Sequence, residues 1–111
     1  MQIGMLRQGA VTIVRPEGAL LEADAPQVKT ALLESASASL GRVVLDMEAI
    51  PFVDSRGLEV LVEVTEEMSE GGQALKLCAA NKTVREVLEL TELAQLFEYF
   101  QDAGSAARSF L

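Results

Sequence analysis

The chain contains no histidine, and this absence excludes more chemistry than any other feature of its composition. A Ser-His-Asp catalytic triad cannot be built without histidine, and neither can a zinc site with imidazole ligands. The single cysteine, Cys78, can form neither a thiolate cage for a metal nor a disulfide within the chain. Carboxylate and lysine chemistry stay open, but the usual general base near neutral pH is missing. We therefore expect no enzyme, no cofactor and no metal site.

Basic residues are also scarce: the chain has 9 basic and 17 acidic residues, which gives a net charge of -8. Nucleic acid needs clustered Lys and Arg to meet its phosphates, so it is not an expected partner. Membrane insertion is not expected either, because no segment reaches the length of a span. The first residues lack the basic flank and the apolar run of a signal peptide. With no disulfide possible, we expect the chain in the reducing cytoplasm.

Aliphatic residues are abundant: 50% of the 111 residues are hydrophobic, which suffices for the core of one domain spanning 1–111. Short β-branched or alternating apolar runs predict strands, and apolar residues at helical spacing after a capping residue predict helices. The expected strands are 3–7, 10–15, 42–47, 74–79 and 96–100. The expected helices run from Asp24 to Ser39, over 57–70, from Asn81 or Thr83 onward, and from Asp102 onward.

This order of elements predicts an α/β fold with a mixed, mostly parallel sheet, right-handed crossovers and an opening antiparallel hairpin. Each helix should turn one apolar stripe toward the core. The expected core residues are Ala25, Val28, Leu32 and Ser35 in the first helix, Leu58, Leu61, Val62, Thr65 and Met68 in the second, Val84, Val87, Leu88 and Thr91 in the third, and Ala103, Ala106, Ala107 and Phe110 in the last.

The stretch "IPFVDSRGL", residues 50–58, lies where a strand gives way to the second helix. Functional sites of α/β folds gather at such connections. Ser55 has two compatible interpretations. It can cap the helix, because Asp and Ser oxygens accept hydrogen bonds from free backbone N–H groups. It can also be phosphorylated: the helix dipole would tolerate the phosphate, whereas a partner packed there would have to desolvate it.

The outer side of the second helix is the candidate partner surface. We expect Val60 to project outward there, away from the core stripe, among glutamates. A solvated acidic face that aids solubility is the simpler explanation of the glutamates alone. The expected glutamates are Glu59, Glu63, Glu66, Glu67 and Glu70.

Two other candidates are weaker. Asp46 lies inside a buried-strand pattern and resembles a phosphoaspartate position, but such sites need further carboxylates for Mg²⁺ and a nearby lysine. No clear acidic pair follows the first strands, which favours a structural Asp46. Cys78 lies in an apolar strand and is expected in the core. Neither G-x-G-x-x-G nor G-x-x-x-x-G-K occurs, so no nucleotide-binding loop is predicted.

The central stretch "VVLDMEAIPFVDSRGLEVLVEV" resembles the signature of STAS domains, the anti-sigma factor antagonist family, in which a strand, a short loop and a D-S-x-G-L turn lead into a helix. The resemblance spans nearly the whole chain. Gly18 matches the family's G-x-L region, "GGQALKLCAA" resembles its next strand, and "VREVLELTELAQLFEYF" resembles its third helix and following strand.

The resemblance implies an anti-sigma factor antagonist whose serine at the position of Ser55 is phosphorylated by a kinase that is also the anti-sigma factor. The unphosphorylated antagonist binds this kinase and releases a sigma factor, and a serine phosphatase resets the phosphorylated form. The kinase supplies ATP and Mg²⁺. The expected partner contacts surround Ser55: Asp54, Arg56, Gly57, Leu58, Glu59, Val60 and Glu63.

Two departures from the family pattern affect this expectation. Position 56 is usually small, and the Arg56 guanidinium can partly neutralise a phosphate on Ser55 or alter kinase recognition. The segment "GALLEADAPQ" lacks the polar-acidic pattern that often joins the partner surface. Two alternatives therefore stay open: a STAS subunit of a lipid transporter or sensory scaffold that is never phosphorylated, and, less favoured, an enzyme or phosphoaspartate receiver using Asp46.

Overall fold

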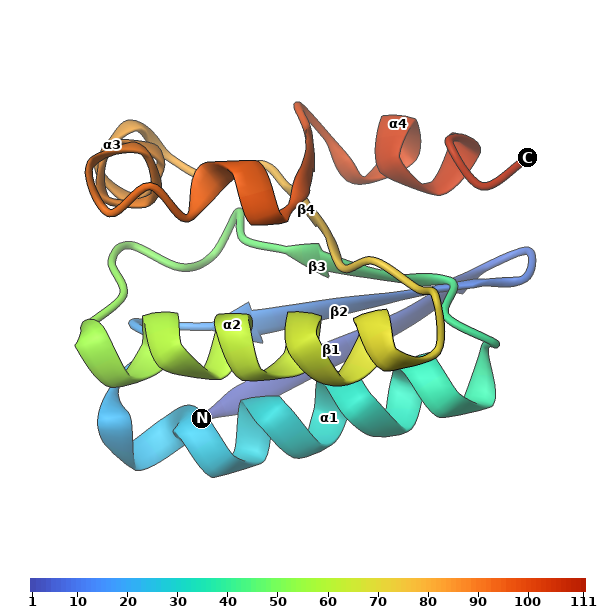
Figure 1. Ribbon diagram of the computed structural model, residues 1–111, viewed down its shortest axis with the longest axis horizontal. Coiled ribbons are helices and arrows are strands. Elements are labelled where there is room, and N and C mark those ends of the chain that lie inside the picture. Colours follow the sequence, from blue (N-terminus) through green and yellow to red (C-terminus); the bar gives the residue numbers. More distant parts are fainter.

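The computed structural model describes residues 1–111 and contains one five-stranded sheet with the strand order β1-β2-β3-β4-β5 (Figure 1). β1 and β2 pair antiparallel, and every later neighbour is parallel. The predicted α/β class with an opening hairpin and a mostly parallel sheet is confirmed. The strands are β1 (Gln2–Gln8), β2 (Val11–Glu17), β3 (Val43–Asp46), β4 (Lys76–Cys78) and β5 (Glu98–Phe100).

Helices cover both faces of the sheet. Side chains of α1, α2 and α3 join the larger hydrophobic core on one face, and the short α4 packs on the other. α1 and α2 lie side by side (Figure 1). None of the helices is both long and apolar enough to cross a membrane. The helices are α1 (Ala25–Ala38), α2 (Ser55–Glu70), α3 (Lys82–Leu90) and α4 (Ala103–Arg108), with short 3-10 helices η1 (Glu22–Asp24) and η2 (Ala94–Leu96).

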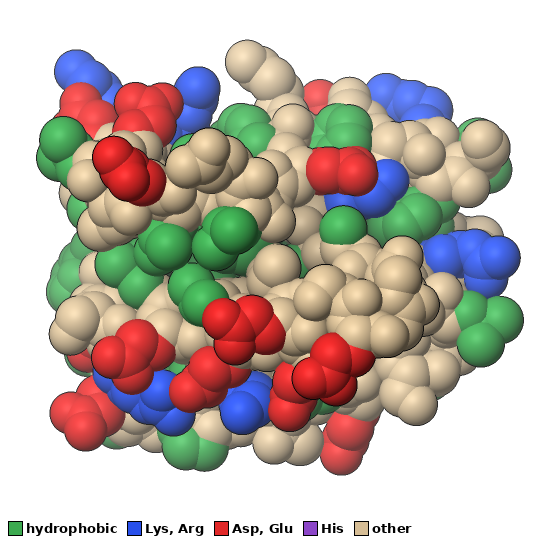
Figure 2. Space-filling model, in the orientation of Figure 1, with side chains coloured by type: hydrophobic (Ala, Val, Ile, Leu, Met, Phe, Trp, Pro, Cys, Tyr) green, Lys and Arg blue, Asp and Glu red, His purple; other side chains and the backbone are tan.

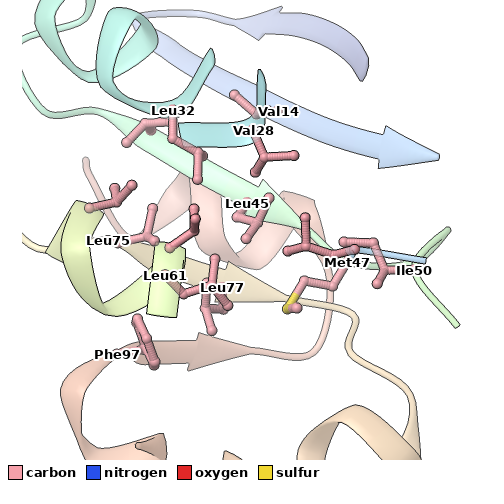
Figure 3. Packing of buried hydrophobic residues seen from close by; sticks show 14 of the residues in the cluster. Val14, Val28, Leu32, Leu45, Met47, Ile50, Leu61, Leu75, Leu77 and Phe97 are labelled. Carbon is pink, nitrogen blue, oxygen red and sulfur yellow. The ribbon is translucent and has the colours of Figure 1, made fainter. Parts of the chain in front are cut away.

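The larger core lies between the sheet and the pair α1/α2 (Figure 3). Leu45 and Leu77 point from adjacent central strands toward Leu32 of α1 and Leu61 of α2, and all four are fully buried. Aliphatic side chains of this size account for most of the hydrophobic stabilisation, at about 1.5–3 kcal/mol for each fully buried residue. The core thereby fixes where β3 ends and α2 begins, and that junction carries Ser55.

The predicted inward face of α2 is shifted by one position. Leu61 and Met68 are buried as expected. Gly57, Val60 and Val64 are buried in place of the expected Leu58, Val62 and Thr65, which are half-buried. Both sets satisfy helical spacing, but the observed set contains Val64 where the expected set has the polar Thr65, so the residue types favour the observed face. Glycine at position 57 lets the start of this face approach Leu20 and Val53 closely.

The predictions for α1 and α3 are confirmed in part. The buried face of α1 is confirmed, and so is capping of α3, where the Val84 N–H donates to Asn81 Oδ1 at 2.8 Å. Asp24 stands at the cap of α1, but its side chain accepts no capping hydrogen bond. Of the core positions expected in the third helix, Val84 and Leu88 are buried, whereas Thr91 is the residue that follows α3 and is exposed.

Candidate functional site at the start of α2

Asp54, rather than Ser55, caps α2. Its Oδ1 accepts a hydrogen bond from the Gly57 N–H at 2.8 Å, and Ser55 becomes the first helical residue. The interpretation of Ser55 as the cap is therefore wrong. A carboxylate accepts more strongly than a hydroxyl, and it also gains from the positive end of the helix dipole. Because Asp54 supplies the capping oxygen, the exposed Ser55 hydroxyl is left outside the cap.

Asp54 also joins two distant segments. Its Oδ2 accepts from the Glu22 N–H at 2.9 Å, and its own N–H donates to the Leu20 carbonyl at 3.1 Å. Leu20 and Val53 form a parallel β-bridge beside these bonds. The hydrogen bond from Gly57, and after it the bond from Glu22, lower the pKa of Asp54, with burial opposing them. The start of α2 is thus held against η1 by hydrogen bonds and a β-bridge.

Gly57 is buried at the closest point of this contact. A Cβ at this position would lie 2.7 Å from the Leu20 carbonyl oxygen and 2.7 Å from Val53 Cγ1. Ordinary side-chain carbons do not approach so closely, so the contact requires glycine. Gly57 was expected as a partner contact, but it packs inside the protein. The glycine of the D-S-x-G motif therefore has a structural role in this chain.

Val60 is fully buried in the larger core. The expectation that it projects outward among the glutamates is wrong, for the same one-position shift that moved the face of α2. Leu58, expected in the core, is half-buried at the edge of that cluster. Glu59 stays exposed, as expected.

Arg56 is held by the glutamates of its own helix. Its Nη1 donates to Glu59 Oε2 at 3.0 Å and to Glu63 Oε1 at 2.9 Å. Lys29 of α1 lies 3.5 Å from the other oxygen of Glu63. The hydrogen bond to Glu63 is the main cause that raises the pKa of Arg56 and lowers that of Glu63.

Because of these ion pairs, the outer side of α2 is not uniformly acidic. Glu63 is half-buried between α1 and α2 and bridges them. Figure 2 shows basic side chains among the acidic ones in the region of α1 and α2. Four of the five glutamates remain exposed on α2, namely Glu59, Glu66, Glu67 and Glu70.

Two exposed apolar residues that were not among the expected partner contacts flank the site. Phe52 is 50% exposed and Leu21 is 37% exposed. They come from segments far apart in the chain that the Leu20–Val53 bridge brings together, and the Leu20 N–H donates to the Phe52 carbonyl at 3.0 Å. A large apolar residue shortly before a helix cap was the available signal for Phe52. Leu21 gave none, because its neighbourhood depends on a long-range contact.

Asp46 and Cys78 occupy structural positions. Asp46 is buried, and its Oδ1 accepts from the Glu48 N–H at 3.0 Å in the turn after β3. Cys78 is fully buried in the smaller core, as expected, and this burial together with the nearby Asp46 charge raises its pKa to about 12. Its thiol is therefore un-ionised at neutral pH.

The STAS domain model of protein families matches residues 2–106. Among curated proteins, the candidate anti-sigma factor antagonist BtrV of Bordetella bronchiseptica is 27% identical over 110 residues, covering 99% of this chain and 95% of BtrV. A candidate anti-sigma factor antagonist from Thermotoga maritima superposes with a TM-score of 0.87 at 21% identity, covering 96% of this chain and 92% of that chain.

The anti-sigma factor antagonist SpoIIAA of Bacillus superposes in its unphosphorylated form with a TM-score of 0.76 at 16% identity, covering 98% of this chain and 96% of SpoIIAA. Its phosphorylated form gives 0.70 at 15% identity, with 97% and 99% covered. The family model spans nearly all of the chain, and the strand order and the D-S-x-G-L turn agree with the expectation from sequence. The chain therefore belongs to the STAS domain family.

Proposed function

We propose that this protein is an anti-sigma factor antagonist that is switched off by phosphorylation of Ser55. The observation that carries the proposal is the free position of Ser55: it is exposed in the first turn of α2, while Asp54 does the capping. The similarity to BtrV and SpoIIAA supports the choice of partner, an anti-sigma factor that is also a serine kinase.

In the proposed reaction the Ser55 hydroxyl oxygen attacks the γ-phosphorus of ATP bound to the kinase. The bond from that phosphorus to the β,γ-bridging oxygen breaks, ADP leaves, and the hydroxyl proton is released. A phosphatase restores the hydroxyl with water and releases inorganic phosphate. This chain supplies the acceptor and the surface, and it acts as a regulator rather than as an enzyme. The cytoplasmic location expected from the sequence stays a prediction.

The fold around Ser55 favours a change at the surface over a change of shape. A phosphate at the first turn of a helix meets the positive end of the dipole, so α2 keeps its structure. The site itself is braced by Asp54 and by the close packing of Gly57. The new charge of roughly -1.5 to -2 therefore acts on the partner, which would have to desolvate it.

Arg56 does little to cancel this charge. Its guanidinium already pairs with Glu59 and Glu63, so a phosphate on Ser55 has to compete with two carboxylates for it. Adjacent residues on a helix also do not face one another. We therefore do not expect Arg56 to weaken the switch. Its ion pairs instead hold the side chains of Glu59 and Glu63 in place.

The partner surface that we propose is centred on Ser55 and combines apolar and acidic groups. Phe52 and Leu21 provide exposed apolar area next to the site, and Glu59 adds charge at its rim. Interfaces commonly place large apolar side chains inside a polar rim.

The test uses the full chain, a serine kinase anti-sigma factor from the same organism, and Mg-ATP. Mass spectrometry is expected to find one phosphate on Ser55 and none in a Ser55→Ala variant. Ser55→Asp is expected to weaken binding to the kinase at least tenfold, which corresponds to about 1.4 kcal/mol. The matched control is Ser37→Asp, which adds the same charge at an exposed position of α1 and should leave binding unchanged.

Two outcomes contradict the proposal. One is an unmodified Ser55 in the presence of an active kinase that binds the chain. The other is a stable complex with a transporter ATPase or a scaffold protein that Ser55→Asp does not weaken, which would identify a STAS subunit without a phosphoswitch.

A further inference from the structure

β1 is the longest free edge of the sheet. It spans seven residues, pairs only with β2, and follows an unbroken register from Gln2 to Gln8 without a bulge. At its centre Met5 is 55% exposed and Leu6 is 60% exposed. Because neighbouring side chains of a strand point to opposite faces, both faces of the edge carry exposed apolar area. Lysine and proline, which commonly protect an edge against pairing, are absent from β1.

A groove runs between β1 and α1, next to this edge. Its volume is about 570 Å³, and Figure 1 shows β1 running beside α1 at the end of the sheet. Ile3, Met5 and Arg7 line it from the strand, and Gln27, Ala31 and Glu34 from the helix. The buried hydroxyl of Ser35 also lines the groove and has no hydrogen-bond partner within the chain.

The charge of this region differs from that of the rest of the protein. Residues 1–16 contain no acidic side chain, although the whole chain carries 17. Arg7 on the strand and Glu34 on the helix stand on the two walls of the groove, and neither has an ion-pair partner within the chain. The groove thus offers one unpaired charge of each sign.

We propose that β1 pairs with β1 of a second copy of this chain, antiparallel about a two-fold axis at Met5. Such a contact is isologous, so each contact between the two copies occurs twice. Met5 then lies opposite Met5, and Ile3 opposite Arg7 of the other copy. The two sheets join into one, and α1 of each copy flanks the other, with Arg7 of one copy close to the helix that carries Glu34 of the other.

Charge favours a second copy over an extended peptide from another protein. Two chains of net charge -8 repel one another over most of their surfaces, but residues 1–16 carry no carboxylate, so the paired β1 strands themselves bring no acidic side chains together. The unpaired Arg7 and Glu34 make the surface complementary to itself. No residue from 50 to 59 lines the groove, so the dimer leaves Ser55 free and does not depend on the proposed function.

Sedimentation equilibrium of the full chain over a range of concentrations tests the proposal. The expected result is a reversible dimer. Met5→Lys places two like charges opposite one another at the axis and should raise the dimer dissociation constant at least tenfold. The matched control is Leu90→Lys, because Leu90 on α3 is 85% exposed and lies outside the groove, and it should not change the dimer.

A charge exchange provides a second measurement if Met5→Lys fails to fold. Arg7→Glu and Glu34→Arg should each weaken the dimer, and the double variant should recover much of the loss. Backbone amides of β1 should also gain protection from hydrogen exchange as concentration rises. The proposal is overturned by a monomer at every concentration, by a dimer that neither Met5→Lys nor the charge exchange weakens, or by protection of β1 only after another protein is added.

Discussion

The start of α2 and the strand β1 both present polar backbone groups at the surface, but they do so in opposite ways. At α2 the groups are already satisfied: Asp54 accepts from Gly57 and Glu22, and the Leu20 carbonyl accepts from Asp54. At β1 the outer edge has no partner within the chain, and Met5 beside it is exposed. One region is complete before any partner arrives, and the other is open.

This difference indicates how each region can act. A rigid site responds to a modification mainly through the charge that it shows to a partner, because few of its internal contacts can rearrange. Ser55 lies in such a site. An open strand edge gains structure only when another strand pairs with it. We therefore expect substitutions of the packed residues at the start of α2 to act on folding, and substitutions at β1 to act on association.

Glycine to alanine in both regions gives the largest expected contrast in stability. In Gly57→Ala the new Cβ would lie 2.7 Å from the Leu20 carbonyl oxygen, and a backbone atom cannot move aside as the tip of a side chain can. We expect a loss of roughly 3 kcal/mol in the free energy of unfolding, at the upper end of the usual cost of overpacking. Urea denaturation at low protein concentration measures it.

Gly4→Ala in β1 is the matched control. There the nearest atom to a new Cβ is the Arg15 carbonyl oxygen at 3.5 Å, an ordinary contact. Alanine also loses less backbone entropy than glycine on folding, so this variant should be as stable as the natural chain or slightly more stable. Equal losses for the two variants would show that the close approach of Gly57 is not what holds α2.

Truncation of an apolar side chain in each region sharpens the contrast. Val60→Ala removes two methyl groups from a fully buried side chain and should cost roughly 2 kcal/mol. Met5→Ala trims a side chain that is more than half exposed and should change the unfolding free energy by less than about 0.5 kcal/mol. An outward Val60, as the sequence suggested, would make both losses small, so urea denaturation of the two variants decides between the two faces of α2.

The sequence predicted the local features of the fold well. The strand and helix order follows from short β-branched runs alternating with helical spacing, and these patterns are set by nearest neighbours. Capping by Asn81 and Asp102 was predictable for the same reason, because a cap bonds to a residue two or three positions away. The position of Ser55 at the junction of β3 and α2 was also predictable from such local patterns.

Features that depend on distant segments were not predictable. The close approach of Gly57 depends on Leu20, which is 37 positions before it in the chain. The exposed pair Leu21 and Phe52 exists only because of the Leu20–Val53 bridge. The ion pair from Glu63 to Lys29 likewise needs α1 and α2 side by side. A single sequence offers no direct signal for such contacts.

The smallest expected effect concerns the charge of Asp54. Its hydrogen bonds lower its pKa in the folded protein below the unfolded value of about 3.9. The carboxylate therefore stabilises the fold above that pH, and the contribution is lost as the pH falls through the folded pKa. Asn can cap a helix as well as Asp but carries no charge. Its amide has one acceptor oxygen, so the bond from the Glu22 N–H is lost in this variant at every pH. We expect the stability difference between the natural chain and Asp54→Asn to shrink in urea titrations from about pH 6 to about pH 2.5.

The control is Arg7→Gln, which removes from β1 a charge that has no ion-pair partner within the chain. The difference in unfolding free energy between the natural chain and this variant should stay nearly constant over the same pH range, since no hydrogen-bonded carboxylate is removed. A constant difference for Asp54→Asn as well would mean that the cap holds α2 through its shape alone, and that the rigidity of the site does not depend on the charge beside Ser55.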